Sequence, residues 1–392
     1  MKDLVRTDAE ARDRDLGKYL LPIGGIVGII VIILGLTILA DPRAGQNLLA
    51  SIYEFLGNPE GALALRRNQG DLELAKILLA IVAIAIGVGG VWLLYAGVSA
   101  IVGLLGPRWQ DRIIPWVFIL PALALLTLYL VYPTAATIIA SFTDGTNGDP
   151  LRHYKELTTP PFVAIFRNNL LWLVIGTLGS VGLGLLIAGL VDRVRREALA
   201  KTFIFLPLAI SLVGASVIWR FVYQWRPEGQ PQYGLLNAIW TGLGFDPVLW
   251  IQTPPINTYA LIVIMIWLQT GFAMVILSAA IKGVSTEILE AARLDGASER
   301  QIFFSVIVPI IKGSILTVAT TIAIVVLKIF DIVYVMTGGR FDTDVVANRM
   351  FLEKFQFFND GRAAALATVL FLAVLPIMIV NVRNLRKQGV GS

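Results

Sequence analysis

The chain has 392 residues, of which 56% are hydrophobic and 15% charged, and its mean hydropathy is +0.76. Soluble domains carry about 25% charged residues, so this composition all but excludes a cytosolic enzyme and excludes a disordered chain. Cysteine is absent, histidine occurs once and the net charge is +5, which exclude disulfides, thiolate metal sites and multi-histidine sites and give no indication of nucleic-acid binding.

Eight stretches are long and apolar enough to cross a bilayer, which takes about 20 residues. In chain order they are Tyr19–Ala40, Lys76–Leu105, Ile113–Tyr132, Asn169–Val191, Phe203–Trp225, Thr258–Ile281, Ser314–Met336 and Ala364–Asn381. The sequence therefore predicts an all-α, polytopic membrane protein with about eight transmembrane helices. Several glycines crowd Asn169–Val191, and because glycine lets helix backbones approach, this span is expected to pack closely against a neighbour.

The distribution of Lys and Arg predicts the orientation, because cytoplasmic loops of membrane proteins carry an excess of both. With a cytoplasmic N-terminus, the segments inside have more than twice the Lys and Arg density of those outside. We therefore expect a multi-pass protein of the plasma (inner) membrane with both termini in the cytoplasm.

Catalytic motifs are missing from the chain. It contains no G-x-x-x-x-G-K-[ST] phosphate loop, no H-E-x-x-H and no G-x-S-x-G, so we expect no enzyme activity and no ATP hydrolysis in this chain. A self-sufficient secondary transporter and a membrane scaffold both remain open from the residues alone. The former often has inverted repeats, and no convincing repeat is present.

One predicted cytoplasmic segment, residues 284–309, is unlike an ordinary connector. Ser285 suits a helix N-cap, and Gly296 suits the position after a helix end. Ser298 and Gln301 form a capping-box pattern that starts a second helix. The segment therefore predicts two short helices joined at Asp295-Gly296.

The first of these helices has a small-residue face. Ile288, Ala291 and Ala292 are expected on one side, flanked by charged residues. The flanking residues are Glu287, Glu290 and Arg293. The pattern fits a helix that enters a groove on another protein, and it fits equally an amphipathic helix packed on its own bundle.

The stretch Glu290-Ala291-Ala292-x-x-Asp295-Gly296-Ala297, followed by Phe303, Ile307 and Pro309, closely resembles the EAA loop of binding-protein-dependent ABC importer permeases. The wider similarity covers about residues 165–385. In that family the loop forms a coupling helix that docks into a cleft of the cytoplasmic ATPase subunit. The resemblance assigns this role to Glu290, Ala291, Ala292, Asp295 and Gly296.

Two further features resemble the larger permease of maltose-type and α-glucoside importers. They are the number of spans and the runs 213–223 and 328–339. The resemblance implies carriage of a carbohydrate, with a non-sugar solute as the alternative. It also implies a permease core over 113–392, preceded over 1–112 by a cytoplasmic segment and a two-helix hairpin.

The same resemblance implies the partners. They are a second homologous permease, two cytoplasmic ATPase subunits, an extracytoplasmic solute-binding protein and membrane lipid. ATP and Mg would be bound by the ATPase, and no cofactor is expected in this chain.

Candidate residues for the solute path lie within the predicted spans. By resemblance, Trp267, Gln269 and Phe272 match a tryptophan-led stretch that helps hold the sugar in maltose-type permeases. Arg220 is a charge in the outer half of a span, and charges at membrane depth are costly unless paired or functional. A buried aromatic stripe is the plain alternative for the first three residues.

Lys328 and Asp331 are three residues apart in a predicted span, so we expect them on one helix face. They would form either an ion pair that fixes helix packing or a polar part of the path. The sequence departs from the family pattern at positions near these two residues. The positions that would face the sugar are apolar, so either the register differs or this subunit holds little of the substrate. These positions are Ile322, Val325, Val326 and Ile329.

Overall fold

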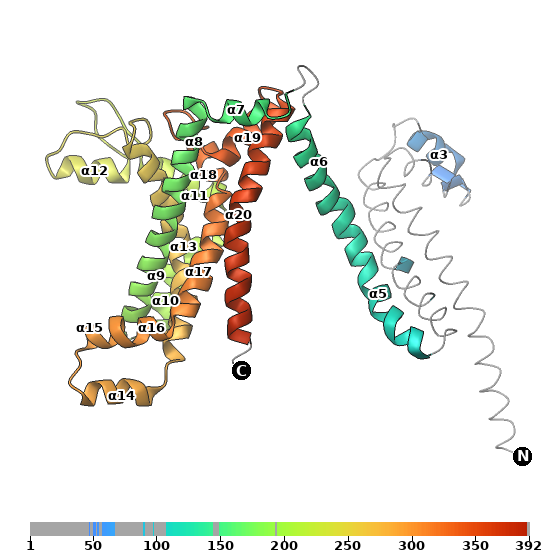
Figure 1. Cartoon of the computed structure of the whole chain (residues 1–392). Coiled ribbons are helices and arrows are strands. Elements are labelled where there is room, and N and C mark those ends of the chain that lie inside the picture. Colours follow the sequence, from blue (N-terminus) through green and yellow to red (C-terminus); the bar gives the residue numbers. More distant parts are fainter. Residues whose placement is uncertain are drawn as a thin grey trace, which may run out of the picture. The chain divides into compact units, whose positions relative to one another are not determined.

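The computed structural model describes residues 107–143, 149–192 and 194–389, together with 57–66 and single positions between 47 and 97 (Figure 1). The regular elements in these ranges are all helices, which confirms the predicted all-α class. The predicted spans Tyr19–Ala40 and Lys76–Leu105 lie outside the described residues, apart from three glycines of the second. The described part has four helices long and apolar enough to cross a membrane, or up to six if each of two bent pairs is one span.

The chain divides into two compact units, Met1–Pro133 and Thr134–Ser392. In the first unit the structure describes α3 (Pro59–Arg66), α5 (Pro107–Leu126) and η1 (Thr127–Val131). The chain continues through α6 (Tyr132–Phe142) into the second unit, and Ala122–Phe142 is one of the four candidate spans. The domain boundary expected after residue 112 stays a prediction.

The second unit is built around α13 (Ile256–Lys282), which packs along α9 (Thr177–Val191). A Cβ atom on Gly184 would lie 2.4 Å from Ala273 Cβ and 2.9 Å from the Met274 backbone nitrogen. A Cβ atom on Gly179 would lie 2.5 Å from Ile266 Cδ1. The expected close packing of the glycine-rich span is therefore confirmed, since a side chain at Gly184 would meet the backbone of α13.

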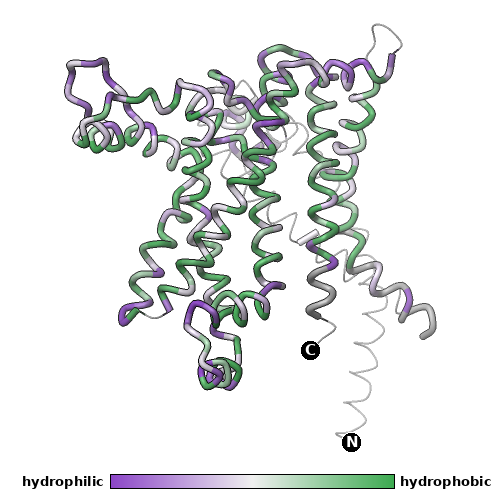
Figure 2. Tube along the Cα trace, turned by 60° about the vertical axis from the view of Figure 1, so that its left-hand side comes forward, coloured by the Kyte–Doolittle hydropathy of each residue, from purple (hydrophilic) through white to green (hydrophobic). Residues whose placement is uncertain are grey.

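Helix α13 is apolar all round because it lies inside the unit, whose core continues into α17 (Lys312–Leu327). Its fully buried apolar side chains include Leu261, Ile264, Met265, Ala273, Met274 and Leu277. Helix α9 is continuous with η2 (Trp172–Gly176) and α8 (Pro160–Leu171), giving a 32-residue span, Pro160–Val191. Hydrophobic residues run along the long helices, and hydrophilic ones gather near the helix ends and in the loops (Figure 2).

The predicted span Phe203–Trp225 is wrong as a single helix. Helix α10 (Glu197–Phe205) and η3 (Leu206–Ala209) are bent by 102° from α11 (Leu212–Val222). Pro207 lies in η3, and the Ser211 hydroxyl accepts a 3.0 Å hydrogen bond from the Gly214 amide, which starts a new helix.

The predicted span Ser314–Met336 is also broken, because α17 ends at Leu327 and α18 (Asp331–Met336) starts after a gap. The Asn169 amide donates to the Leu327 carbonyl oxygen at 3.2 Å and so satisfies a carbonyl at the helix end. Because this partner comes from α8, the local sequence does not reveal the break. A second bend, of 72°, separates α17 from α15 (Glu299–Gln301), η4 (Ile302–Ile307) and α16 (Val308–Ile310).

Short helices cover the two ends of the unit. One end carries α14 (Thr286–Leu294), and we call it the α14 end (Figure 1). The opposite end, which we call the α12 end, carries further short helices (Figure 1). These are α7 (Arg152–Leu157), α12 (Leu235–Gly242) and α19 (Val346–Phe355). The last helix, α20 (Asp360–Gly389), runs back towards the α14 end (Figure 1).

Candidate functional site

Helix α14 stands clear of the bundle at the end of a short hairpin (Figure 1). The two predicted short helices are confirmed: α14 ends at Leu294, Gly296 has a φ of +80°, and α15 starts after Ser298. The Ser298–Gln301 capping box is present, with Ser298 N donating to Gln301 Oε1 at 2.8 Å. Ser285 occupies the N-cap position of α14 but makes no side-chain cap hydrogen bond.

A small apolar cluster holds α14 in place. Leu289 and Ala292 pack against it from α14. The cluster consists of the buried residues Val284, Ile302, Ile307 and Ile311. The predicted common face of Ile288, Ala291 and Ala292 is therefore divided: Ala292 turns inward with Leu289, while Ile288 and Ala291 stay exposed.

The exposed surface of α14 carries both large apolar and charged side chains. Ile288 is 47% exposed and Leu294 is 89% exposed. Glu290 and Asp295 are exposed beside them. At the joint, Arg293 Nε contacts Glu299 Oε1 at 2.9 Å and ties α14 to α15. An exposed apolar patch with a charged rim is typical of a protein-binding surface.

A polar cluster connects the base of this hairpin to α10, and the sequence reasoning missed it. Lys201 Nζ contacts Asp192 at 2.7 Å, and Ser278 donates to the same carboxylate at 2.6 Å. Glu197 bridges Lys201 and Lys282, each at 2.5 Å. We call these five residues the anchor cluster. The sequence did contain a signal for this cluster, because residues of opposite charge lie at the ends of three apolar segments.

The structure places Trp267, on α13, in an aromatic group with two residues at the end of α11. Its ring centroid lies 5.7 Å from that of Trp219 in an edge arrangement, and Trp219 lies 5.1 Å from Tyr223. Gln269 and Phe272 are half-buried on the same helix, and Phe272 packs against the core. Trp267, Gln269 and Phe272 are therefore all partly exposed rather than fully buried.

The orientation of α17 explains why the positions expected to face the sugar are apolar. Ile322, Val326 and Ile329 are at most 2% exposed and belong to the core, and Val325 packs against it. The more open side of α17 instead carries three threonines, Thr317, Thr320 and Thr321, all partly exposed. Their hydroxyl groups donate to carbonyl oxygens one turn earlier in the same helix, and Leu316 is exposed beside them.

The expected arrangement of Lys328 and Asp331 on one helix face is wrong. Lys328 follows the end of α17 and Asp331 starts α18. The two residues are therefore not on one helix, and the rule that residues three apart share a helix face does not apply to them. Lys328 is exposed and Asp331 half-buried, and no ion pair joins them in the described part of the chain. Arg220, the third charge, donates from its Nη2 atom to the Val335 carbonyl oxygen and so links α11 to α18.

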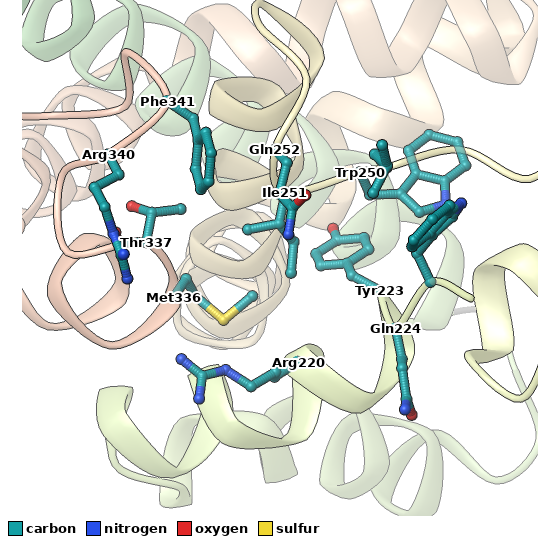
Figure 3. Close-up of a pocket in the computed structure, with 12 residues that line it drawn as sticks. Arg220, Tyr223, Gln224, Trp250, Ile251, Gln252, Met336, Thr337, Arg340 and Phe341 are labelled. Atoms are coloured by element: carbon teal, nitrogen blue, oxygen red, sulfur yellow. The ribbon is translucent and has the colours of Figure 1, made fainter. Parts of the chain in front are cut away.

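A cavity of about 390 Å³ lies at the α12 end, beside Arg220 (Figure 3). Its walls come from the end of α11, from residues 249–252 and from residues 336–341. Figure 3 shows Arg340 and Phe341 on one side and Tyr223 and Trp250 on the other. None of Trp267, Gln269, Phe272, Lys328 and Asp331 lines this cavity.

Buried asparagines fix the loops around this cavity. Asn168 donates to the carbonyl oxygens of Asp342 and Asp344 at 2.7 and 3.0 Å. On the opposite side, Asn237 accepts from Trp250 Nε1 at 2.9 Å and donates to the Val248 carbonyl oxygen at 3.0 Å. The two asparagine side chains are buried, and their hydrogen bonds attach these loops to the helices beneath them.

Comparison with known proteins places these features in a family. Residues 180–387 match the family described as binding-protein-dependent transport system inner membrane component. The osmoprotective compounds uptake permease protein GgtC of Synechocystis sp. is 53% identical over 69% of this chain and 98% of its own length. The α-glucoside transport system permease protein AglF of Rhizobium meliloti is 48% identical over 72% of this chain and 86% of its own length.

The fold is similar to that of a solved transporter. A chain in the crystal structure of a bacterial alginate ABC transporter, in complex with an alginate pentasaccharide-bound periplasmic protein, superposes with a TM-score of 0.60. The match is 19% identical in sequence and covers 70% of this chain and 95% of the other.

Proposed function

Because this chain belongs to the family of binding-protein-dependent transport system inner membrane components, we propose that it is a permease subunit of an ATP-driven importer for a carbohydrate, an α-glucoside or oligosaccharide. The observation that carries this proposal is α14, an exposed helix whose sequence resembles the EAA loop. The names of the relatives GgtC and AglF support a small osmoprotective or glucosidic solute.

The proposed complex contains a second homologous permease, two cytoplasmic ATPase subunits and an extracytoplasmic solute-binding protein. The ATPase subunits would bind ATP and Mg. The exposed side chains of Ile288 and Leu294 support a protein partner at α14, because a partner surface would cover their apolar area. Glu290 and Asp295 would meet the rim of the partner's cleft.

The proposed orientation puts the α14 end in the cytoplasm and both chain termini with it. The density of Lys and Arg supports this orientation. The last helix, α20, ends on the same side of its unit as α14 (Figure 1). The α12 end and its cavity would then face the solute-binding protein.

Coupling would run from α14 into the spans through packed side chains. ATP binding closes the ATPase pair and moves the cleft that holds α14. Leu289 and Ala292 pass this motion to the cluster around Ile302 and Ile307, which leads through the 72° bend into α17. ATP can favour the outward-facing state only through contacts that differ between the two states, and α14 would provide them.

The proposed solute path uses polar groups on the open sides of α13 and α17. Gln269, Thr320, Thr321 and Lys328 are at least partly exposed although they lie in or next to apolar spans. Polar side chains at membrane depth usually face a water-filled path or another protein. The second permease would supply the opposite wall.

A pull-down with mass spectrometry tests the proposal. Wild type and Glu290→Lys are solubilised in detergent, and the co-purifying proteins are identified. We expect the wild type to bring an ATPase subunit and a second permease, and the variant to lose only the ATPase. If the folded wild type reproducibly comes down alone, the importer assignment fails and a self-sufficient transporter becomes the better hypothesis.

A further inference from the structure

The cavity at the α12 end is separate from the proposed coupling helix α14 and from the candidate solute-path residues in the middle of the spans. Two arginines, Arg220 and Arg340, line it, and no carboxylate does. In the described part of the chain each guanidinium donates one hydrogen bond, Arg220 to the Val335 carbonyl oxygen and Arg340 to that of Thr337. A guanidinium has five N–H groups, so most of the donors at this cavity are left for a ligand.

The other walls suit a sugar ring. Trp250 offers partly exposed aromatic surface, and the Tyr223 ring also lines the cavity but is only 3% exposed. The polar atoms of both are already engaged, by Asn237 and by the Ala260 carbonyl oxygen respectively. Gln224 and Gln252 add side-chain amides. Aromatic faces beside a few polar groups are typical of small-molecule sites, and about 390 Å³ lies in their usual size range of roughly 300–1,000 Å³.

The wall that carries Arg340 is rigid for a reason found in the chain. Gly338 and Gly339 have φ values of +63° and +79°, which lets the chain reverse directly after Met336. A Cβ atom on Gly339 would lie 2.5 Å from Asn348 Nδ2. Thr337 and Thr343 close the turn with a 2.6 Å hydroxyl hydrogen bond. The position of Arg340 is therefore set before any ligand arrives.

We propose that this cavity is an outer solute subsite, which binds an oxygen-rich pyranoside released by the binding protein before the solute reaches the middle of the membrane. This inference rests on the proposed carbohydrate function. Position supports it: Arg220 belongs to α11, and the preceding residue, Trp219, contacts the ring of Trp267. The solute would thus pass from the guanidinium groups to the mid-span aromatic group along one helix.

Direct binding tests the subsite. The assembled importer, without binding protein or nucleotide, is titrated with trehalose and with a glucuronic-acid disaccharide, and binding is followed by saturation-transfer difference NMR. We expect Arg340→Gln and Gln252→Ala each to raise the dissociation constant, the first by about tenfold, as for one charge-assisted hydrogen bond. Arg226→Gln is the matched control, because Arg226 lies over the Tyr233 ring and does not line the cavity.

The two probes identify the group that is recognised. Equal binding means that hydroxyls are read, and preference for the uronate means that the guanidinium groups read a carboxylate. Trp267→Ala is expected to leave this binding in place. The subsite is rejected if wild type and the cavity variants bind equally, or if Trp267→Ala alone removes binding. The subsite is also rejected if the wild-type importer binds neither sugar on its own but takes one of them up when its binding protein is present. In that case the proposed carbohydrate function stands. Failure to take up any sugar counts against the carbohydrate function itself.

Discussion

Asn257 on α13 donates a 2.7 Å hydrogen bond to the carbonyl oxygen of Phe341, which lies 84 residues later in the chain. The Asn257 side chain is fully buried, and Phe341 has a φ of +60°, a strained value for a residue with a side chain. The amide therefore fixes a loop that its own sequence does not favour, and this loop forms one wall of the cavity at the α12 end.

Asn257→Ala is expected to lower the free energy of unfolding by about 1–3 kcal/mol, because the substitution removes a hydrogen bond made by a fully buried amide and leaves the Phe341 carbonyl without this donor. Thermal unfolding of the detergent-solubilised protein measures the change. Gln356→Ala serves as control, since Gln356 is exposed and its side chain has no hydrogen-bond partner in the described part of the chain. Equal midpoints for the two variants would contradict a structural role for this amide.

Glu290→Lys reverses the charge at the edge of α14 and is expected to reduce solute uptake at least about tenfold, within the usual range of coupling free energies. Membrane insertion and protein level should stay normal, because Glu290 is exposed. Uptake of labelled solute in cells measures the effect. Glu60→Lys makes the same charge change on the exposed surface of α3 and should transport normally. Unchanged uptake in Glu290→Lys at equal protein level would remove the coupling assignment.

Gly296→Ala and Gly244→Ala form a second matched pair. Both glycines have a positive φ, +80° and +88°, and a Cβ atom on either would meet nothing within 4 Å. Each substitution should therefore destabilise its turn by about 1–2 kcal/mol through backbone strain alone. Only Gly296 lies at the joint of α14 and α15, so only Gly296→Ala should lower the number of solute molecules moved per ATP. Equal coupling ratios in reconstituted vesicles would show that the turn is not part of the coupling route.

Gly184→Ala tests the contact between α9 and α13. The new methyl would meet Ala273 Cβ and the Met274 backbone, which cannot move without shifting a helix, so we expect a loss of about 1–3 kcal/mol. Gly182→Ala lies on the same helix, with nothing within 4 Å of its Cβ position. It should be neutral or stabilising, because alanine favours a helix by about 1 kcal/mol over glycine. Chemical unfolding in detergent compares the two, and the reverse order would show that the helices do not pack as described.

Stability at low pH should depend on Glu156. Burial opposes ionisation of this carboxyl, but hydrogen bonds from Arg362 and Arg152 outweigh it and hold the pKa of Glu156 below its usual value of 4.5. A carboxyl with a lowered pKa in the folded state contributes stability above pH 4.5, and this contribution is lost as the pH falls through the folded-state pKa. Wild type should therefore lose thermal stability below about pH 4.5.

Glu156→Gln removes the group that titrates. The variant should be less stable at neutral pH and should lose less of its stability between pH 6 and the acid range than wild type does. Glu228→Gln, in an exposed loop, should keep the wild-type acid loss. Parallel pH profiles for wild type and Glu156→Gln would rule out this carboxyl as the source.

The short elements around α14 could be predicted from sequence because their signals are local. Gly296 ends a helix and Ser298 with Gln301 starts the next, through contacts made within four residues. The apolar spans follow equally from composition, since a bilayer requires about 20 apolar residues in a row. The resemblance to the EAA loop also rests on a contiguous stretch.

Only the tertiary structure decided where spans break and which side of each helix is open. Helix α17 ends at Leu327 because Asn169, 158 residues earlier, binds its carbonyl oxygen, and this break separates Lys328 from Asp331. Ala292 turns inward because an apolar cluster from residues 302–311 lies beneath it. The cavity brings Arg220 and Arg340 together across 120 residues of chain. The hydrophobicity of a helix indicates how much of its surface must be buried. Which face is buried depends on packing partners that are distant in the sequence.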